Sequence, residues 1–216
     1  MSLNANALTT VSRQKSFQGI TVSTHDTALE LLINSVSNYV EKMTGRKFKR
    51  QAFSNEIYDG KDSKHLYLKN FPVISGETIT LQQRNSALNE DDWETVEATD
   101  YFVENATGRL TLISINSFAS GVTGVFSPGV QNWRVSYTAG FYLPQDVGFG
   151  SNYEDDLPTD LEMVVWELVG TVFNKRKAQG VEKSKVRDIE VWFAAELGKD
   201  PIMKQTLSQY RRRSYG

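Results

Sequence analysis

The sequence predicts an α+β fold in which N-terminal and C-terminal helices pack together around a central antiparallel β region. Near both ends the apolar residues recur with the period of a helix, whereas from Arg50 to Phe141 they recur at every second residue. The β segments are short and closely spaced, which favours antiparallel pairing because parallel strands need a crossover connection. With 216 residues, 39% of them hydrophobic, the chain can bury a core without disulfide bonds.

Two helices are expected at the start of the chain. Thr9 or Thr10 is placed to cap a short helix that Gly19 ends. Ser23–Asp26 has the spacing of a capping box before a second helix, which Gly45 ends. The apolar residues that share one face of this second helix are Leu29, Leu32, Ile33, Val36, Val40 and Met43. This periodicity predicts a helix that faces the core.

Seven β segments are expected in the centre of the chain. They are Ala52–Tyr58, His65–Phe71, Glu77–Gln83, Trp93–Val96, Asp100–Val103, Arg109–Ile113 and Trp133–Tyr137, with turns at Asp59-Gly60, Asn105–Gly108 and Pro128-Gly129. The stretch Ser114–Val130 is rich in Gly, Ser and Thr and predicts a long loop. Within this loop Phe118 and Phe126 would either anchor the segment or contact a partner.

The C-terminal part predicts a strongly periodic helix. Thr159 and Glu162 have capping-box spacing, and Gly180 supplies a stop. The apolar residues on one face of this helix are Leu161, Val164, Val165, Leu168, Val169, Val172 and Phe173. Val186–Leu197 fits a helix or a strand, and the alanines near its end favour a helix. The basic tail Pro201–Gly216 is expected to order on a partner.

The composition excludes several kinds of chemistry. There are no cysteines and only two histidines, His25 and His65, which excludes thiolate metal sites, cysteine nucleophiles and a three-histidine metal site. We therefore expect a protein that is not an enzyme and assign no catalytic, cofactor-binding or metal-binding residue. The most apolar stretch, Met163–Phe173, is interrupted by Glu167, so no membrane span is expected.

Charge is distributed unevenly along the chain. Residues 51–160 contain 16 acidic and 6 basic side chains, whereas the two flanks contain 18 basic and 10 acidic ones. The basic residues concentrate in Lys42–Arg50, Lys175–Arg187 and Arg211–Arg213. These segments could bind nucleic-acid phosphates, so a nucleic-acid-binding module is the alternative function. The chain contains no base-reading motif, and basic residues at helix ends commonly complement the helix dipole.

Several short motifs occur in an order that resembles one protein family. They are Leu8-Thr9-Thr10, Thr44–Phe48, Tyr58-Asp59-Gly60, Leu66-Tyr67-Leu68, Phe71–Ile74, Thr107–Leu110, Tyr137–Gly140, Leu157–Leu161, and Leu207 with Tyr210-Arg211-Arg212. In order and spacing they are similar to the head-tail connector (adaptor) proteins of long-tailed bacteriophages and prophages. The resemblance extends from Leu8 to Arg212, although the loops 114–130 and 141–156 are longer than in compact members and 181–200 matches poorly.

The resemblance implies one connector-like domain over residues 1–216. Its parts would be N-terminal helices at 8–48, a β region at 50–141, C-terminal helices at 158–198 and a basic tail at 199–216. The subunits of such a family form a ring, which we expect to contain about twelve copies joined by heterologous contacts. The opposite charges of the flanks and the middle would favour these contacts.

The resemblance also implies the partners of the ring. It would dock beneath the portal protein at the head-tail junction of the virion and receive a tail-side stopper or completion protein. DNA would pass through its channel during packaging without sequence-specific binding, and assembly would take place in the host cytoplasm. We expect Tyr210, Arg211, Arg212 and Arg213 to contact the portal, and Phe118 and Phe126 to be loop contacts.

Overall fold

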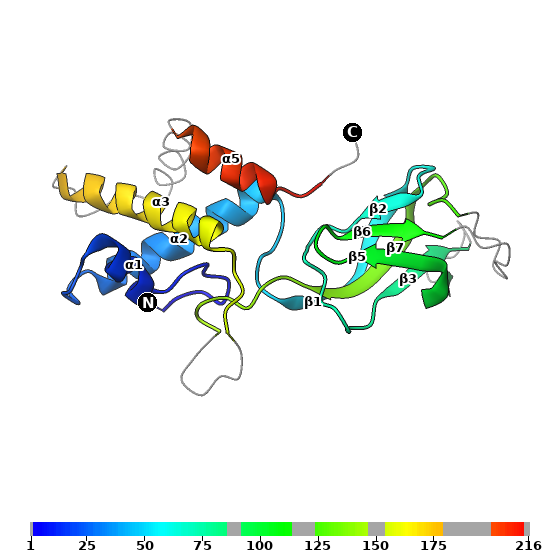
Figure 1. The fold of residues 1–216 in the computed structure, drawn as a ribbon, viewed down its shortest axis with the longest axis horizontal. Coiled ribbons are helices and arrows are strands. Elements are labelled where there is room, and N and C mark those ends of the chain that lie inside the picture. Colours follow the sequence, from blue (N-terminus) through cyan, green and yellow to red (C-terminus); the bar gives the residue numbers. More distant parts are fainter. Residues whose placement is uncertain (1, 86–91, 114–123, 147–153, 179–199, 214–216) are drawn as a thin grey trace. The chain divides into compact units, whose positions relative to one another are not determined.

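The computed structural model describes residues 2–85, 92–113, 124–146, 154–178 and 200–213. The chain divides into two compact units (Figure 1). The helical unit comprises Met1–Lys49 and Phe141–Arg212, and the β unit comprises Arg50–Gly140 with Arg213–Gly216. Among the described helices, none combines the length and the apolar character needed to cross a membrane.

The helical unit is built around a central pair of helices. Its helices are α1 (Val11–Gln18), α2 (Asp26–Thr44), α3 (Thr159–Ala178) and α5 (Pro201–Gln209). The two long helices α2 and α3 pack against each other, and α1 and α5 each contact both of them. One hydrophobic core joins these four described helices. The first and last parts of the sequence therefore fold together, as the α+β prediction required.

The predicted ends of the first two helices are confirmed. The Thr10 hydroxyl accepts a hydrogen bond from the Arg13 N–H at 3.3 Å, and Gly19 ends α1 in the left-handed conformation. Gly45, with φ 69°, ends α2 in the same way. All seven apolar residues predicted on one face of α3 are buried. On α2 the exception is Met43, which is 47% exposed at the last turn.

The side-chain hydrogen bonds predicted by the two capping boxes are not formed. The residue before α2 is His25, which makes no side-chain capping hydrogen bond. In α3 the Glu162 carboxylate accepts hydrogen bonds from Thr9 and Arg13 instead of returning to the start of its own helix. A buried carboxylate gains more from a hydroxyl and a guanidinium than from a backbone amide at a helix end. Tertiary contacts therefore replaced the local cap.

The β unit contains two antiparallel sheets. Its strands are β1 (Gln51–Gly60), β2 (His65–Tyr67), β3 (Thr80–Arg84), β4 (Trp93–Thr95), β5 (Tyr101–Glu104), β6 (Arg109–Leu112) and β7 (Gly129–Ala139), and η1 (Ala98–Asp100) precedes β5. The strand orders are β1-β7-β3-β4 and β2-β6-β5, and every ladder is antiparallel. Buried residues of both sheets form one core. The predicted antiparallel β region is confirmed.

The predicted turn at Asp59-Gly60 is wrong, because both residues continue β1. Gly60 lies opposite Gly129 and donates its N–H to the Asn132 side-chain oxygen at 2.8 Å. A Cβ at Gly60 would stand 1.7 Å from the Ser127 carbonyl oxygen, so the glycine permits a close backbone approach rather than a turn. The turn predicted at Asn105–Gly108 is confirmed by the bond from the Gly108 N–H to the Glu104 carbonyl.

Two segments predicted to lack regular structure are partly folded. In the predicted loop Ser114–Val130, the part from 124 onward is described, and its last residues begin β7. In the tail Pro201–Gly216, the first nine residues form α5, which Asp200 caps at the Ile202 and Met203 N–H groups. The expectation that this tail orders only on a partner is therefore wrong for α5. The predicted segment Val186–Leu197 lies outside the described residues.

Candidate functional site

The C-terminal end of α5 carries the predicted portal-contact residues and is tied to the end of α2. The Arg212 backbone N–H donates to the Thr44 carbonyl at 2.7 Å, which satisfies an acceptor in the last turn of α2. Arg211 and Arg212 are both exposed. We call Tyr210, Arg211 and Arg212 the basic corner. It is a defined part of the helical unit rather than a loose extension.

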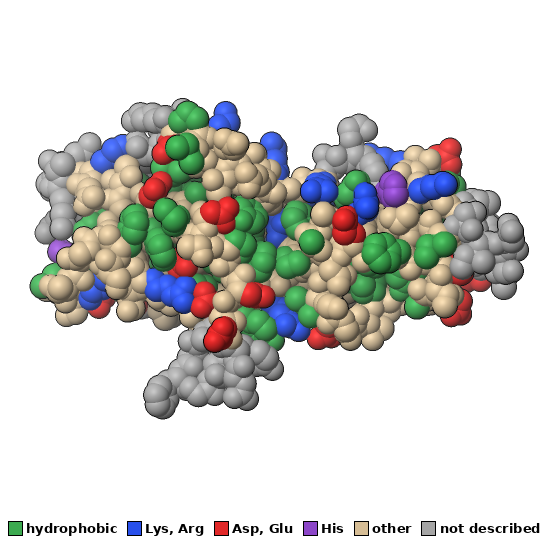
Figure 2. All heavy atoms as spheres, in the orientation of Figure 1, with side chains coloured by type: hydrophobic (Ala, Val, Ile, Leu, Met, Phe, Trp, Pro, Cys, Tyr) green, Lys and Arg blue, Asp and Glu red, His purple; other side chains and the backbone are tan. Residues whose placement is uncertain are grey.

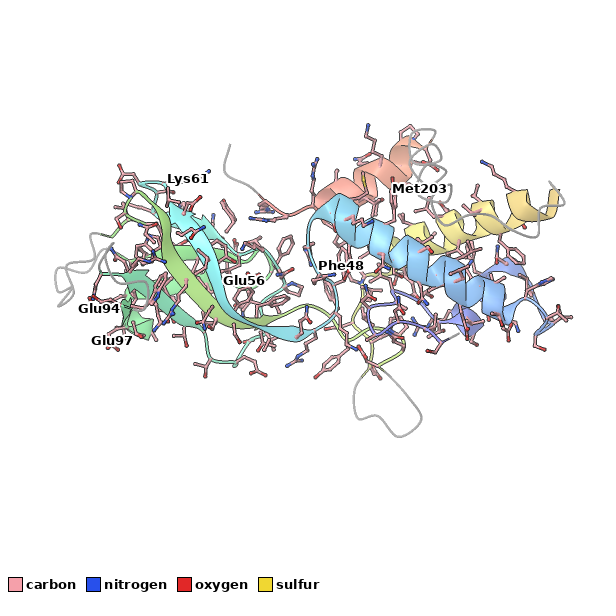
Figure 3. The ribbon with its side chains drawn as sticks, turned by 180° about the vertical axis from the view of Figure 1, so that it is seen from behind. Phe48, Glu56, Lys61, Glu94, Glu97 and Met203 are labelled. Carbon is pink, nitrogen blue, oxygen red and sulfur yellow. The ribbon has the colours of Figure 1, made fainter. Side chains whose placement is uncertain are left out.

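Tyr210 positions the basic corner. Its ring packs edge-on against Phe48 with a centroid distance of 6.4 Å, and its hydroxyl donates to the Asp160 carboxylate at 2.6 Å. Burial raises the pKa of Tyr210, and the hydrogen bond to Asp160 raises that pKa further. The phenol therefore stays a neutral donor that links α5 to the start of α3. Figure 3 shows Phe48 just beyond the end of α2.

Arg211 and Arg212 leave positive charge at this corner. Neither side chain forms an ion pair with another described residue. From Pro201 to Arg213 the sequence contains no acidic residue. The partial negative charge at the C-terminus of α2 favours cations at this position. Arg213 falls in the β unit, where its guanidinium lies 5.9 Å from the centre of the Tyr67 ring.

The basic segment Lys42–Arg50 is largely matched by acidic partners, and each pair lies within one unit. The ion pairs are Lys47–Glu41 at 2.7 Å, Lys49–Asp146 at 2.7 Å and Arg50–Glu77 at 3.3 Å. Arg46 is 4% exposed, and its guanidinium lies over the Phe48 ring. These contacts remove most of the free charge on which the nucleic-acid alternative depended. The second basic segment, Lys175–Arg187, lies mostly outside the described residues.

Phe126 and the histidines have structural contacts. Phe126 is 1% exposed, and its ring packs edge-on against Trp133 at 4.9 Å, so it anchors the loop inside the β core. His25 packs against Phe173, and the His65 ring nitrogen bonds to a threonine hydroxyl on β6. The described residues contain no group of three potential metal ligands. Phe118 lies outside the described residues.

A partly buried ionic network joins α1, α3 and the segment before α3. The Arg13 guanidinium contacts both oxygens of Asp155 at 2.9 and 2.8 Å and reaches Glu162 at 3.0 Å. Glu162 also accepts the Thr9 hydroxyl at 2.7 Å, and the Thr9 oxygen accepts the Trp166 indole N–H. No motif in the sequence indicates this network. Arg13 is 142 and 149 residues away from its two carboxylate partners, so no local pattern joins them.

The Arg13–Asp155 pair predicts a dependence of stability on pH. The hydrogen bond from Arg13 lowers the pKa of Asp155 below the ordinary value of 3.8. A lowered folded-state pKa contributes stability that is present above pH 3.8 and is lost as the pH falls below it. We expect Arg13→Gln to flatten the fall in stability between about pH 5 and pH 2.5. Urea unfolding at several pH values measures this, and equal slopes for both proteins would contradict it.

A second buried network closes the β unit. The Tyr58 and Tyr137 hydroxyls both donate to one Glu56 carboxylate oxygen, at 2.7 and 2.6 Å. Burial raises the pKa of both tyrosines, so they remain neutral donors. The two hydroxyl oxygens also accept backbone N–H groups from Lys69 and Asn70. The two hydroxyls and the Glu56 carboxylate thus hydrogen-bond to one another and to the backbone, which indicates a structural role for the cluster.

In the described residues the two polar clusters thus have structural contacts, and the exposed arginines of the basic corner are the candidate contact with a partner. The family model for head completion proteins matches residues 7–149, more than half of the chain. The chain belongs to the head completion protein family. This membership confirms the similarity to head-tail connectors and defines a structural role in joining head and tail.

A solved structure extends the similarity to the complete chain. A chain in the neck of an empty GTA particle, computed with C6 symmetry, is similar with a TM-score of 0.55 and 13% sequence identity. The match covers 100% of this chain and 96% of the neck chain. The two proteins therefore share a fold at low sequence identity. No curated protein matches this sequence.

Proposed function

We propose that the protein forms a ring at the head-tail junction, docks beneath the portal and extends the DNA channel toward the tail. The observation that carries the proposal is the family match over residues 7–149. The C6 symmetry of the similar neck supports it, because a six-fold axis accommodates rings of six or of about twelve copies. We retain about twelve copies and a tail-side stopper or completion protein as the expected assembly.

The basic corner is the proposed portal contact. Arg211 and Arg212 are exposed cations just after α5, in a segment that the Arg212 N–H already anchors to the end of α2, so little ordering entropy opposes binding. Arginine binds carboxylates through two parallel hydrogen bonds, which suits an acidic surface on the portal. Tyr210 acts as a positioning residue through Asp160. We retain Arg213 and Phe118 as further proposed contacts.

DNA passage requires no specific binding site. The main basic segment, Lys42–Arg50, is matched by acidic partners, and a channel that DNA must traverse gains nothing from tight phosphate binding. We therefore propose that DNA passes during packaging without sequence-specific contacts and that the protein assembles in the host cytoplasm before it joins the virion.

Native mass spectrometry and negative-stain imaging, with and without the portal protein of the same particle, test the ring. We expect closed rings with an open centre, either alone at high concentration or on the portal. A protein that remains monomeric and does not bind the portal would contradict the proposal. Salt-sensitive binding of bare DNA by such a monomer would support the nucleic-acid alternative.

Charge reversal tests the portal contact. We expect Arg211→Glu/Arg212→Glu to weaken portal binding at least about tenfold, because a favourable charge contact becomes repulsive. The melting temperature should change little, since both side chains are exposed. The matched control is Lys61→Glu/Lys64→Glu, which reverses two exposed cations of the β unit. Equal portal affinity for both double variants would exclude the basic corner.

Deletion of the tail is a poorer test. Leu207 is 5% exposed and belongs to the core of the helical unit. Removing Pro201–Gly216 would therefore expose core residues as well as remove the arginines. Point substitutions separate the two effects.

A further inference from the structure

Two arginines lie over one tryptophan on the four-stranded sheet of the β unit. Arg84 on β3 is paired with Trp93 on β4, and Arg134 on β7 is paired with Gln82, two residues before Arg84. The guanidinium carbons of Arg84 and Arg134 lie 4.8 and 4.5 Å from the centre of the Trp93 ring. We call Arg84, Trp93 and Arg134 the arginine–tryptophan cluster.

The register places this cluster on the face of the sheet that is turned away from the β core. Leu81 and Val135 are paired with each other and fully buried in that core. Side chains alternate between the two faces of a strand, so Arg84 and Arg134 lie on the opposite, outer face. All three side chains of the cluster are half-buried. Part of each is therefore accessible to another molecule.

The positive charge of the cluster has no counter-ion among the described residues. Neither arginine forms an ion pair with any of them. The Arg134 Nε donates to the Gln82 side-chain oxygen at 2.6 Å, which is a neutral partner. The Arg84 Nε is buried and has no hydrogen-bond partner in the described part of the chain. Two like charges held over one ring repel each other, so an anion beside them would stabilise the cluster.

The surroundings of the cluster favour a single anionic group over a polyanion. Residues 92–100 contain four acidic side chains and no basic one. Figure 3 labels two of them, Glu94 and Glu97, at this end of the β unit, and acidic side chains appear at its lower right in Figure 2. A run of nucleic-acid phosphates would be repelled by these carboxylates. One carboxylate, which a planar guanidinium binds through two parallel hydrogen bonds, meets much less repulsion.

Strand β4 offers backbone hydrogen-bonding groups beside the cluster. It is the outermost strand in the order β1-β7-β3-β4. The Val96 N–H donates to the Leu81 carbonyl at 2.9 Å. Hydrogen-bonded and non-hydrogen-bonded residues alternate along an antiparallel pair, so the Thr95 N–H and C=O point away from β3, toward the edge. An extended peptide segment can add to such an edge through its own backbone.

We propose that the arginine–tryptophan cluster binds a glutamate or aspartate side chain of a partner protein, carried by an extended segment that adds to the sheet at β4. The carboxylate would lie between the guanidinium groups of Arg84 and Arg134, and the backbone of the segment would pair with Thr95. Alternate side chains of an added strand fall on the face of the cluster, which sets the register of the acidic residue. The site lies within one copy, so the inference does not depend on the proposed ring.

Two synthetic peptides test the site on the unaltered, complete protein. Acetyl-Thr-Glu-Thr-Glu-Thr-amide places both carboxylates on one face of an extended strand, and acetyl-Thr-Gln-Thr-Gln-Thr-amide is its uncharged counterpart. We expect the glutamate peptide to bind at least about tenfold more tightly, because its hydrogen bonds to arginine are charge-assisted. Titrations followed by nuclear magnetic resonance at the Trp93 indole N–H and the Thr95 amide measure both affinities.

Arginine variants connect this preference to the cluster. Arg84→Gln/Arg134→Gln should bind the two peptides equally. Arg84→Lys/Arg134→Lys keeps both charges but loses the planar forks, so it should lose most of the preference as well. The matched control is Arg109→Gln, which removes an arginine of the other sheet that already pairs with Glu104 at 3.4 Å. The comparison of the two peptides on the unaltered protein stays decisive if a variant does not fold.

Four results would overturn the inference. Equal affinity of the unaltered protein for the two peptides would exclude a carboxylate site. An unchanged preference in folded Arg84→Gln/Arg134→Gln would place the binding elsewhere. Shifts at the Trp93 indole without shifts at the Thr95 amide would exclude addition of a strand at β4. Tighter binding of a short DNA duplex than of the glutamate peptide at physiological salt would assign the cluster to nucleic-acid phosphates.

Discussion

Replacing Arg13 with methionine should lower the free energy of unfolding by about 3 kcal/mol. Arg13 is the cation beside Glu162, whose side chain is only 4% exposed. Without it, a buried carboxylate keeps the Thr9 hydroxyl as a donor and loses its opposite charge. Breaking a buried ion pair by removing one partner costs more than the pair contributes, because the remaining charge stays desolvated. Urea unfolding followed by circular dichroism measures the loss.

The double variant Arg13→Met/Glu162→Leu is the control for this mechanism. It should recover a large part of the lost stability, because it removes the buried charge together with its partner. If the double variant loses as much free energy of unfolding as the two single variants together, the unpaired buried charge is not the cause of the loss. A loss below about 1 kcal/mol for Arg13→Met would contradict the prediction.

The same variant has a consequence for the basic corner. Arg13 holds Asp155 and Glu162 together, and these residues bracket Asp160, which orients Tyr210. Loosening the start of α3 should therefore weaken the proposed portal binding even though Arg13 lies on a different helix. Portal affinity measured under conditions in which the variant is fully folded tests this coupling.

Replacing Trp133 with alanine should lower the free energy of unfolding by about 3–5 kcal/mol. Trp133 is fully buried in the β core, packs against Phe126 and directs its indole N–H toward the Ser127 carbonyl. Its removal leaves a large cavity between elements that β7 holds together. Chemical denaturation, followed by hydrogen exchange at backbone amides of the β unit, measures this loss of stability.

Trp93 provides the matched control. It is half-buried at β4, where the guanidinium groups of Arg84 and Arg134 lie over its ring at 4.8 and 4.5 Å. Trp93→Ala should cost about 1–2 kcal/mol, because it loses partial burial and two cation–π contacts but leaves no closed cavity. Equal losses for the two tryptophans would show that Phe126 and Trp133 are not the centre of the β core.

The elements that could be predicted are those whose information is local. Two periodic patterns are examples: the helical period of the Leu161–Phe173 segment and the two-residue period of the β region. Each reflects which side chains are buried on one face of the element. Gly19 and Gly45 end helices because they adopt positive φ at little cost. These features require no knowledge of distant residues.

The errors occur where distant residues compete with local patterns. Glu162 fits a capping box, but Thr9 and Arg13 provide stronger donors. Asp59-Gly60 has the composition of a turn, but Gly60 continues β1 because Gly129 lies opposite. The tail looks polar, yet Leu207 is buried in the core of the helical unit, and Met203 and Tyr210 pack against that core.

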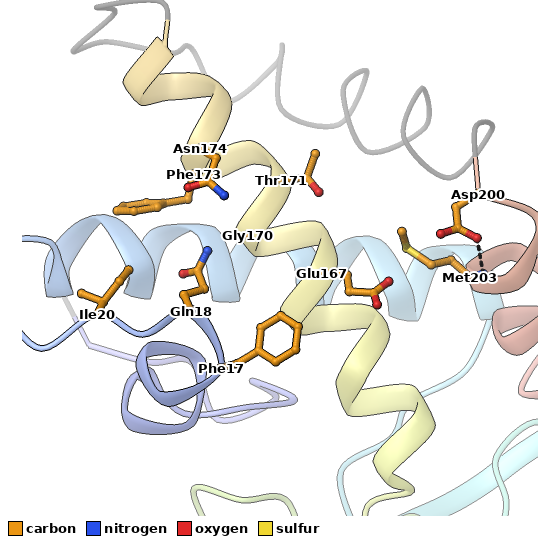
Figure 4. A pocket seen from close by; sticks show the side chains of 10 residues that line it. All are labelled: Phe17, Gln18, Ile20, Glu167, Gly170, Thr171, Phe173, Asn174, Asp200 and Met203. Atoms are coloured by element: carbon orange, nitrogen blue, oxygen red, sulfur yellow. Dashed lines mark hydrogen bonds between the residues drawn. The ribbon is translucent and has the colours of Figure 1, made fainter.

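The proposed site could be predicted only in outline. The sequence indicated Tyr210, Arg211 and Arg212 as one group, whereas the structure separates a positioning phenol from two exposed cations. Phe126 could equally have faced a partner until its 4.9 Å contact with Trp133 placed it in the core. The cavity lined by residues near the end of α1, on α3 and at the start of α5 had no signal in the sequence, because its lining comes from three separate segments of the chain (Figure 4).

The α+β class, the positions of the periodic elements and the family resemblance that membership confirmed could all be predicted from the residues alone. Periodicity and motif order are properties of neighbouring residues, so they can be read directly. Only the tertiary structure decided which charges are free. Lys47, Lys49 and Arg50 meet carboxylates 6, 97 and 27 residues away, while Arg211 and Arg212 meet none among the described residues. The availability of a charge depends on the folded neighbours that surround it, and those neighbours are not encoded by any local pattern.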